Sequence, residues 1–148
     1  MVFFEWQEEY LTHIDVLDAQ HQKLVAMINS VYDDLYKCQH ISQKQVFIAE
    51  TLKELIDYSC FHFEAEEKLM LRYEYPCYAV HKEEHEQFKM QIAQFVEKHK
   101  QGTLILVFPI FDFLKGWLIS HVLTTDKLYG PYINEKMKDL CVSVESLP

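Results

Sequence analysis

Residues that interrupt helices are scarce in this chain, which has three glycines and four prolines among its 148 residues. So few turn-forming residues predict long helices joined by few connections. Disorder is excluded, because apolar residues make up 49% of the chain and aromatic residues 14%. A chain of this length can bury one core and is short for two. We therefore expect a single domain over residues 1–148.

Positive charge is also scarce: 14 lysines and arginines stand against 23 aspartates and glutamates, and the net charge is −9. No basic cluster is present that could bind phosphates, so neither nucleic acid nor an anionic membrane surface is an expected partner. Long hydrophobic runs are missing too. The most apolar segment, LILVFPIF at residues 104–111, is too short to span a bilayer. These absences predict a protein that does not insert into membranes.

Two further absences concern location in the cell. No CxxC pair occurs, and the four cysteines, Cys38, Cys60, Cys77 and Cys141, are scattered along the chain. This spacing is typical of reduced thiols in a cytosol rather than of a disulfide framework. The first residues, MVFFEWQEEYL, lack a basic stretch and carry three glutamates, unlike a signal peptide. We expect a cytoplasmic protein.

What the chain does have is four segments with apolar residues at helical spacing. The first extends from about Asp18 to Tyr36, and the second is expected to start with Ser42 as its N-cap and to end before Pro76. The third ends at KQGT, residues 100–103, and the fourth follows that break. Four helices with short links predict an all-α protein, an up-down-up-down four-helix bundle.

Segments outside the bundle are expected at both ends. Residues 1–17 precede the periodic pattern and include several aromatic side chains, which predicts an N-terminal arm packed across the bundle. The bundle then occupies about residues 18–126. YGP at residues 129–131 predicts a turn, with a short C-terminal helix over about residues 127–140.

Each of the four helices carries at least one histidine on its apolar face. One such residue alone is most simply a core histidine that is hydrogen-bonded to a neighbour. Five of them in one bundle are another matter, because burying five imidazoles without a shared partner costs free energy. A metal ion supplies that partner. The five are His21, His62, His81, His85 and His121.

The spacing of these residues supports a metal site. His62 and Glu66 are four residues apart, and so are His81 and His85, so each pair projects from one face of its helix. A carboxylate supplied together with histidines suits iron, copper or zinc. Magnesium and calcium prefer shells made of oxygen alone.

Asp126 follows His121 by five residues, which is roughly 140° around an ideal helix. Both side chains can face one site only if the helix contains a π-bulge or ends near Thr124 and Thr125, and such irregularities are common at functional sites. Asp126 alone can equally be interpreted as the N-cap of the terminal helix.

Five imidazoles and two carboxylates are too many ligands for one ion. Two ions that share bridging carboxylates fit the count. The other three histidines have no carboxylate at matching spacing and are interpreted as structural or solvated: His13, His40 and His99.

A competing motif overlaps the third helix. HKEEH at residues 81–85 fits the zinc-protease pattern H-x-x-E-H, in which Glu84 would be the general base. The pattern is short and arises by chance on glutamate-rich helices. It also leaves His21, His62 and His121 without a role, so a zinc protease is the remote alternative.

Taken together, these residues resemble the hemerythrins, and more closely the single-domain bacterial members of that family. The resemblance covers nearly the whole chain. It starts with Trp6 and Tyr10 and continues through LDAQH (17–21), Ile28-Asn29, HFEAEEKLM (62–70), YP (75–76), HKEEHEQF (81–88), LKGWLISHV (114–122) and DKLYGPY (126–132). One departure is His13, which stands where bacterial members often have glycine. The link between the third and fourth helices is the other, since it is longer than usual.

The resemblance implies a non-heme di-iron centre. His81, His85 and His121 would complete the shell of one iron, and His21 and His62 would hold the other. Glu66 and Asp126 would bridge the pair together with a solvent-derived oxygen. The second iron would then have a vacant position for dioxygen, in a dry pocket formed by Leu24, Phe63, Trp117, Leu118 and Leu123.

Two classes of function follow from the resemblance. The first is reversible dioxygen binding for delivery, storage or sensing, with an oxygenase or a signalling protein as a conceivable partner. The second is a di-iron enzyme with oxidase, peroxidase or nitric-oxide-consuming activity. Carboxylate-rich di-iron enzymes use four glutamates and two Glu-x-x-His motifs. Five neutral imidazoles and two acids favour the ferrous state and hence oxygen binding, so we expect that the protein is not an enzyme.

Overall fold

The computed structural model describes residues 3–37, 41–101 and 107–145 of the chain. Four long helices cover most of these residues: α1 (Asp15–Lys37), α2 (Ile41–Arg72), α3 (Tyr78–Lys100) and α4 (Val107–Ser120). A π-helical segment, η2 (His121–Asp126), then leads directly into α5 (Lys127–Glu145). A 3₁₀ turn, η1 (Glu8–Tyr10), precedes α1, and no strand occurs in the described ranges.

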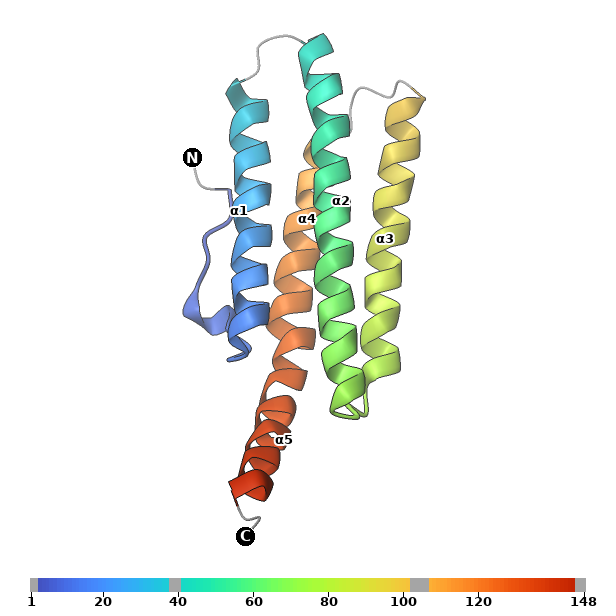
Figure 1. The fold of residues 1–148 in the computed structure, drawn as a ribbon. Coiled ribbons are helices and arrows are strands. Elements are labelled where there is room, and N and C mark those ends of the chain that lie inside the picture. Colours follow the sequence, from blue (N-terminus) through green and yellow to red (C-terminus); the bar gives the residue numbers. More distant parts are fainter. Residues whose placement is uncertain (1–2, 38–40, 102–106, 146–148) are drawn as a thin grey trace.

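The four helices run antiparallel to their neighbours in the chain (Figure 1), as the sequence predicts. Contacts join α1 to α2, α2 to α3, and α1 to α4. The bundle closes between α3 and α4, where the Phe88 and Trp117 ring centroids are 4.3 Å apart. The all-α, up-down-up-down bundle is therefore confirmed. No helix in the described part of the chain is long and apolar enough to cross a membrane.

The ends of the helices differ slightly from those predicted. α1 begins at Asp15 rather than near Asp18, and Ser42 lies in the first turn of α2 instead of capping it. Such shifts are common, because a helix end depends on contacts that a periodic pattern does not contain. α3 ends at Lys100, where the KQGT break predicts an end.

The predicted turn at residues 129–131 is wrong. Gly130 and Pro131 lie inside α5, which extends to Glu145, beyond the expected end near residue 140. A Cβ atom on Gly130 would lie 2.6 Å from the Thr12 carbonyl oxygen. The glycine therefore allows the helix to approach the N-terminal arm closely, which is a packing role that looks like a turn signal in the sequence. Asn134 strengthens this approach, because its Nδ2 donates to the same oxygen at 3.3 Å.

The N-terminal arm packs along α1 (Figure 1). Asn29 of α1 fixes it: the Asn29 Oδ1 accepts the backbone N–H groups of Phe3 and Phe4 at 3.1 and 2.8 Å, and its Nδ2 donates to the Phe4 carbonyl at 2.7 Å. Trp6 extends from the arm toward the interior, with its ring centroid 6.4 Å from that of His21. The arm thus covers the side of the bundle where the first predicted ligand lies.

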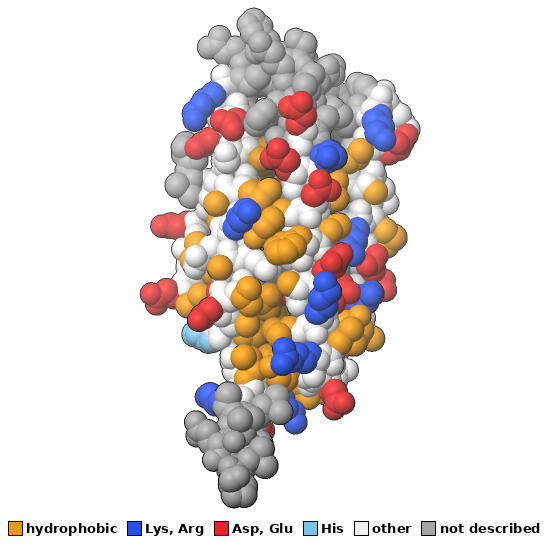
Figure 2. All heavy atoms as spheres, in the orientation of Figure 1, with side chains coloured by type: hydrophobic (Ala, Val, Ile, Leu, Met, Phe, Trp, Pro, Cys, Tyr) orange, Lys and Arg blue, Asp and Glu red, His pale blue; other side chains and the backbone are white. Residues whose placement is uncertain are grey.

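The buried apolar residues form two clusters. The larger one fills the bundle and includes Leu24, Phe63, Phe88 and Leu118. The smaller one lies toward α5 and contains Ile14, Leu17, Met70, Tyr129 and Ile133. Along each helix the predicted ligands fall between residues of these two clusters, as His21 does between Leu17 and Leu24. On the face shown in Figure 2, basic side chains are interspersed with acidic ones, and hydrophobic side chains gather along the middle.

Candidate metal centre

The seven predicted ligands come together in the bundle interior. His21 comes from α1, His62 and Glu66 from α2, His81 and His85 from α3, and His121 and Asp126 from η2. Each is at most 2% exposed. Their ligand atoms form two groups in which all atoms lie within 4.8 Å of one another. The first group is Glu66, His81, His85 and His121, and the second is His21, His62, Glu66 and Asp126.

Glu66 faces both groups with different oxygens. Its Oε1 lies 3.4 Å from His62 Nε2 and 3.5 Å from His21 Nε2. Its Oε2 lies 3.1 Å from His85 Nε2 and 3.6 Å from His81 Nε2. One carboxylate therefore offers one oxygen to each group of histidines, which is the arrangement that a bridging ligand needs.

Asp126 divides its oxygens in the same way. Its Oδ2 lies 3.1 Å from His21 Nε2, whereas its Oδ1 lies 3.1 Å from His121 Nε2 and 3.4 Å from His81 Nε2. The carboxylate is fully buried among these rings. The reading of Asp126 as a mere helix cap is therefore wrong.

The π-helical segment explains how His121 and Asp126 reach the same place. It starts at His121 and ends at Asp126, so the local irregularity predicted from their five-residue spacing is confirmed. A π-turn holds more residues than an α-turn, so residues five apart in this segment lie on the same face. Both side chains thereby turn toward α1 and α3.

Several buried polar atoms of this centre have no hydrogen-bond partner. They include both nitrogens of His21 and of His81, both oxygens of Asp126 and Oε2 of Glu66. The Nε2 atoms of His85 and His121 lie only 3.1 Å apart. Unpaired buried groups cost free energy. Cations between these converging nitrogens and oxygens would satisfy them, so the residues present fit a metal centre.

Burial and the neighbouring carboxylates shift the pKa values of three of these histidines. Burial lowers the pKa of His21, but the carboxylates of Asp126 and Glu66 outweigh burial and raise it to about 10. His121 behaves similarly: despite burial, Asp126 and Glu66 raise its pKa to about 9. Burial dominates for His62 and lowers its pKa to about 4. The two carboxylates thus favour positive charge on His21 and His121, and a cation would supply such charge.

Three outer partners hold the histidine rings from behind, and sequence reasoning missed all three. Gln20 Oε1 lies 2.9 Å from His62 Nδ1, Glu67 Oε1 lies 3.1 Å from His85 Nδ1, and Glu84 Oε2 lies 2.7 Å from His121 Nδ1. Such partners fix the ring so that Nε2 faces the metal. Each lies on a different helix from its histidine, and a periodic pattern within one helix carries no signal for that.

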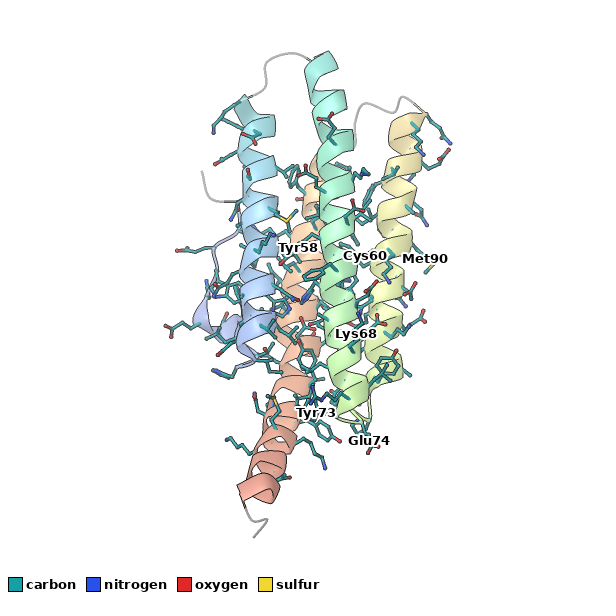
Figure 3. All side chains as sticks on the ribbon, in the orientation of Figure 1. Tyr58, Cys60, Lys68, Tyr73, Glu74 and Met90 are labelled. Atoms are coloured by element: carbon teal, nitrogen blue, oxygen red, sulfur yellow. The ribbon has the colours of Figure 1, made fainter. Side chains whose placement is uncertain are left out.

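Two tyrosines support the centre as well. The Tyr129 hydroxyl donates to Glu66 Oε1 at 2.6 Å and is fully buried. It follows Asp126 by three residues on the same helical face, which is the signal that could have identified it. Tyr58 lies on α2, one turn before His62, and points toward α1 (Figure 3). Its hydroxyl donates to the Gln20 carbonyl at 3.2 Å, and so it steadies the residue behind His62.

Glu84 is not placed as the protease alternative requires. Its carboxylate accepts a hydrogen bond from Nδ1 of His121, which is the nitrogen on the far side of the ring from Nε2. A general base would have to reach a water bound on the Nε2 side. The geometry of Glu84 therefore contradicts the zinc-protease interpretation.

The residues expected around dioxygen all belong to the larger apolar cluster. Leu24, Phe63 and Leu118 are buried, and Trp117 and Leu123 are partly buried. The Phe63 ring stacks on His85 with centroids 3.9 Å apart, and the Trp117 ring stacks on His121 at 4.3 Å. Apolar and aromatic side chains thus cover the ligand rings on the side of the larger cluster. Their role as an oxygen pocket stays a prediction.

The three histidines predicted to lie outside the centre take no part in its described contacts. His13 is exposed and has φ 60° in the N-terminal arm. This left-handed conformation is one that glycine adopts without strain. His40 lies outside the described residues, and so does the side chain of His99.

An all-helical bundle with a buried centre of histidines and carboxylates defines a class, the helical metal-binding bundles. Comparison with known proteins narrows the class to a family. Residues 12–133 match the family model described as the hemerythrin HHE cation binding domain. The chain belongs to the hemerythrin family.

Its relatives cover nearly its full length. A bacteriohemerythrin of Pseudomonas aeruginosa is 32% identical over 144 residues, 95% of this chain and 88% of the relative. The bacteriohemerythrin of Methylococcus capsulatus is 30% identical over 135 residues, 90% of this chain and 99% of the relative. The crystal structure of a wild-type hemerythrin superposes with a TM-score of 0.76 at 29% identity, covering 87% of this chain and 96% of that one.

Proposed function

We propose that this protein binds dioxygen reversibly at a pair of non-heme iron ions, for oxygen delivery, storage or sensing. The observation that carries the proposal is that Glu66 and Asp126 each turn one oxygen toward each of two groups of histidines. Membership in the hemerythrin family and the bacteriohemerythrin relatives support it. Two shared carboxylates and two histidine groups match two ions rather than one.

The ligands divide unequally between the two positions. His81, His85 and His121, with Glu66 Oε2 and Asp126 Oδ1, would hold one ion. His21 and His62, with Glu66 Oε1 and Asp126 Oδ2, would hold the other, which leaves that position with one protein ligand fewer. A ferrous pair in such sites supplies the electrons with which dioxygen is bound reversibly.

The protein's own side chains protect this chemistry. Leu24, Phe63 and Leu118 are at most 2% exposed and bring apolar surface up to the centre, which excludes water and stray protons. The Tyr129 hydroxyl, bonded to Glu66 Oε1, holds that oxygen toward His21 and His62. Phe63 and Trp117 stack on His85 and His121 and fix the planes of those rings.

We favour oxygen binding over catalysis because the buried polar side chains of the centre already serve as proposed ligands or bond to one. In the described ranges, every buried histidine, aspartate and glutamate of the centre is needed as a ligand, and Tyr129 is bonded to Glu66. No further acid or base is left there to serve a substrate. We also propose that residues 1–148 form one cytoplasmic domain with dioxygen as its ligand.

The experiment is an absorbance spectrum. The purified protein is loaded with ferrous iron without oxygen, exposed to air and then purged again, while its metal content is measured. We expect two irons per chain and a visible charge-transfer band that appears in air and disappears on purging. Protein loaded with zinc is the control and should stay colourless. One zinc per native chain, or a band that never forms, would refute the proposal.

A further inference from the structure

Glu84 is one of two acids in the segment at residues 81–85, and neither is a predicted metal ligand. It lies on α3 between His81 and His85, but its carboxylate turns away from them toward η2. Its Oε2 accepts two hydrogen bonds there, from His121 Nδ1 at 2.7 Å and from Thr125 Oγ1 at 2.8 Å. One oxygen thus ties α3 to the π-helical segment at two points.

The three bonds behind the ligand histidines differ in charge. The partner of His62 is the neutral amide of Gln20. Glu67, the partner of His85, is an anion that Lys82 neutralises, with Nζ 3.1 Å from Oε2. Glu84 has no lysine or arginine at ion-pair distance within the described residues, and its bond to His121 is the shortest of the three. The strongest of these interactions is therefore expected at His121.

We propose that Glu84 is a positioning residue that aims His121 Nε2 at the metal position shared with His81 and His85 and makes this imidazole a stronger electron donor. A carboxylate on the far nitrogen of a ligating histidine fixes the tautomer and raises ligand basicity. The two metal positions then differ in charge as well as in ligand number, and the higher oxidation state is favoured on the side of His121. The inference rests on the proposed function only for the presence of two metals.

The surroundings of Glu84 make it suitable for substitution. Its side chain is 37% exposed, whereas His121 is 2% exposed. It borders a pocket of about 450 Å³ whose lining also includes Gln87, Trp117 and Thr124. Water in this pocket can replace a removed carboxylate, so the fold should survive. The exposure also means that solvent screens the charge of the carboxylate. Glu84 is therefore expected to act on His121 mainly through the hydrogen bond and less through long-range electrostatics.

Four variants separate the effect of Glu84 on the orientation of the His121 ring from the effect of its charge. Glu84→Ala removes both the hydrogen bond and the charge, while Glu84→Gln keeps an acceptor oxygen and removes the charge. Thr125→Val removes the hydroxyl that anchors Glu84 and leaves the carboxylate in place. Glu83→Gln is the matched control, because it removes the same charge from an exposed neighbour on α3. Thermal unfolding of each variant checks that the bundle is retained.

The first measurement uses cobalt(II) alone. Protein loaded with two cobalt ions is mixed with a chelator, and the visible absorbance follows metal release, for which two phases are expected. Glu84→Ala should accelerate one phase by about 10- to 100-fold and leave the other unchanged. Thr125→Val should accelerate the same phase less, and Glu83→Gln should match the wild type. Release from Glu84→Ala that equals release from Glu83→Gln would overturn the proposal.

The second measurement is the reduction potential of the iron-loaded protein. Glu84→Gln should raise the potential relative to Glu83→Gln, since a neutral partner makes His121 a poorer donor to ferric iron. Equal potentials in these two variants would also overturn the proposal. The cobalt readout involves neither iron nor oxygen. If the wild type forms no oxygen band while Glu84→Ala still releases cobalt faster, only the proposed function fails.

Discussion

Two regions of the bundle interior are equally buried and yet differ in what they need. Phe63 and Glu66 both have 0% exposure and lie three residues apart on α2. Phe63 belongs to the larger apolar cluster, whose side chains pack against one another and need no further partner. Glu66 belongs to a centre with several unpaired polar atoms. The apolar region stabilises the bundle, while the polar region reduces stability until cations fill it. The residues that stabilise the bundle and the residues of the polar centre thus lie at different positions along the same helices.

Removing metal should have the largest effect, because it separates the two regions directly. The loaded protein should melt at a clearly higher temperature than a fully metal-free sample, since binding to the folded state alone adds to folding free energy. Calorimetry of both forms at one pH measures the difference. The same melting temperature in both would mean that the centre is already satisfied without cations.

Loss of either shared carboxylate should come next. Glu66→Ala and Asp126→Ala should each lower iron content below two per chain, because each residue serves both histidine groups. Glu67→Ala should lower it less, since the only predicted ligand that Glu67 contacts is the His85 ring, at its outer nitrogen. Elemental analysis of the purified variants gives the result, with the exposed Glu64→Ala as the control. Equal losses at positions 66 and 67 would contradict the assignment.

Leu118→Ala tests whether the apolar region also serves the centre. Leu118 is 2% exposed and lies one turn before His121, so truncation should cost roughly 2–5 kcal/mol of stability. If Leu118 excludes water, the variant should keep two irons but lose its oxygenated form faster by autoxidation. The decay of the charge-transfer band, beside that of the wild type, measures this. Equal decay rates in folded samples would leave Leu118 with a packing role only.

The smallest effect is expected at His13, which is exposed and belongs to neither region. His13 has φ 60°, which disfavours residues with a Cβ atom, so His13→Gly should stabilise the metal-loaded protein by about 0.5 kcal/mol. The gain is small because glycine also adds freedom to the unfolded chain. Urea unfolding is sufficient to detect it. Gln22→Gly, in the middle of α1, should destabilise by a similar amount, and a loss in both variants would contradict the strain argument.

The sequence predicts most of what lies within one helix and little of what lies between helices. The spacing of His62 and Glu66, of His81 and His85, and of His121 and Asp126 is a property of one segment each, so the ligand faces and the π-helical irregularity could be foreseen. The close approach of Gly130 to Thr12 involves two distant segments, and the sequence therefore suggests a turn that does not exist.

The residues that hydrogen-bond to the outer nitrogens of the ligand histidines could not be predicted from the sequence, for the same reason. Gln20 stands behind His62 and Glu84 behind His121, in each case across a helix–helix boundary. Which residues face each other there depends on how far one helix is shifted along its neighbour. Interdigitating side chains set that shift, and periodicity within a single segment does not encode it.

The π-helical segment also sets the rotation of α5 about its axis. α4, η2 and α5 are continuous, so one residue more or fewer in η2 rotates the whole of α5 by roughly 100°. Deleting Thr124 would therefore do more than misplace Asp126. Tyr129 and Ile133, both fully buried, would turn toward solvent, and Gly130 would lose its place against the arm. The six residues of η2 thus determine which face of α5 packs against the N-terminal arm and the bundle.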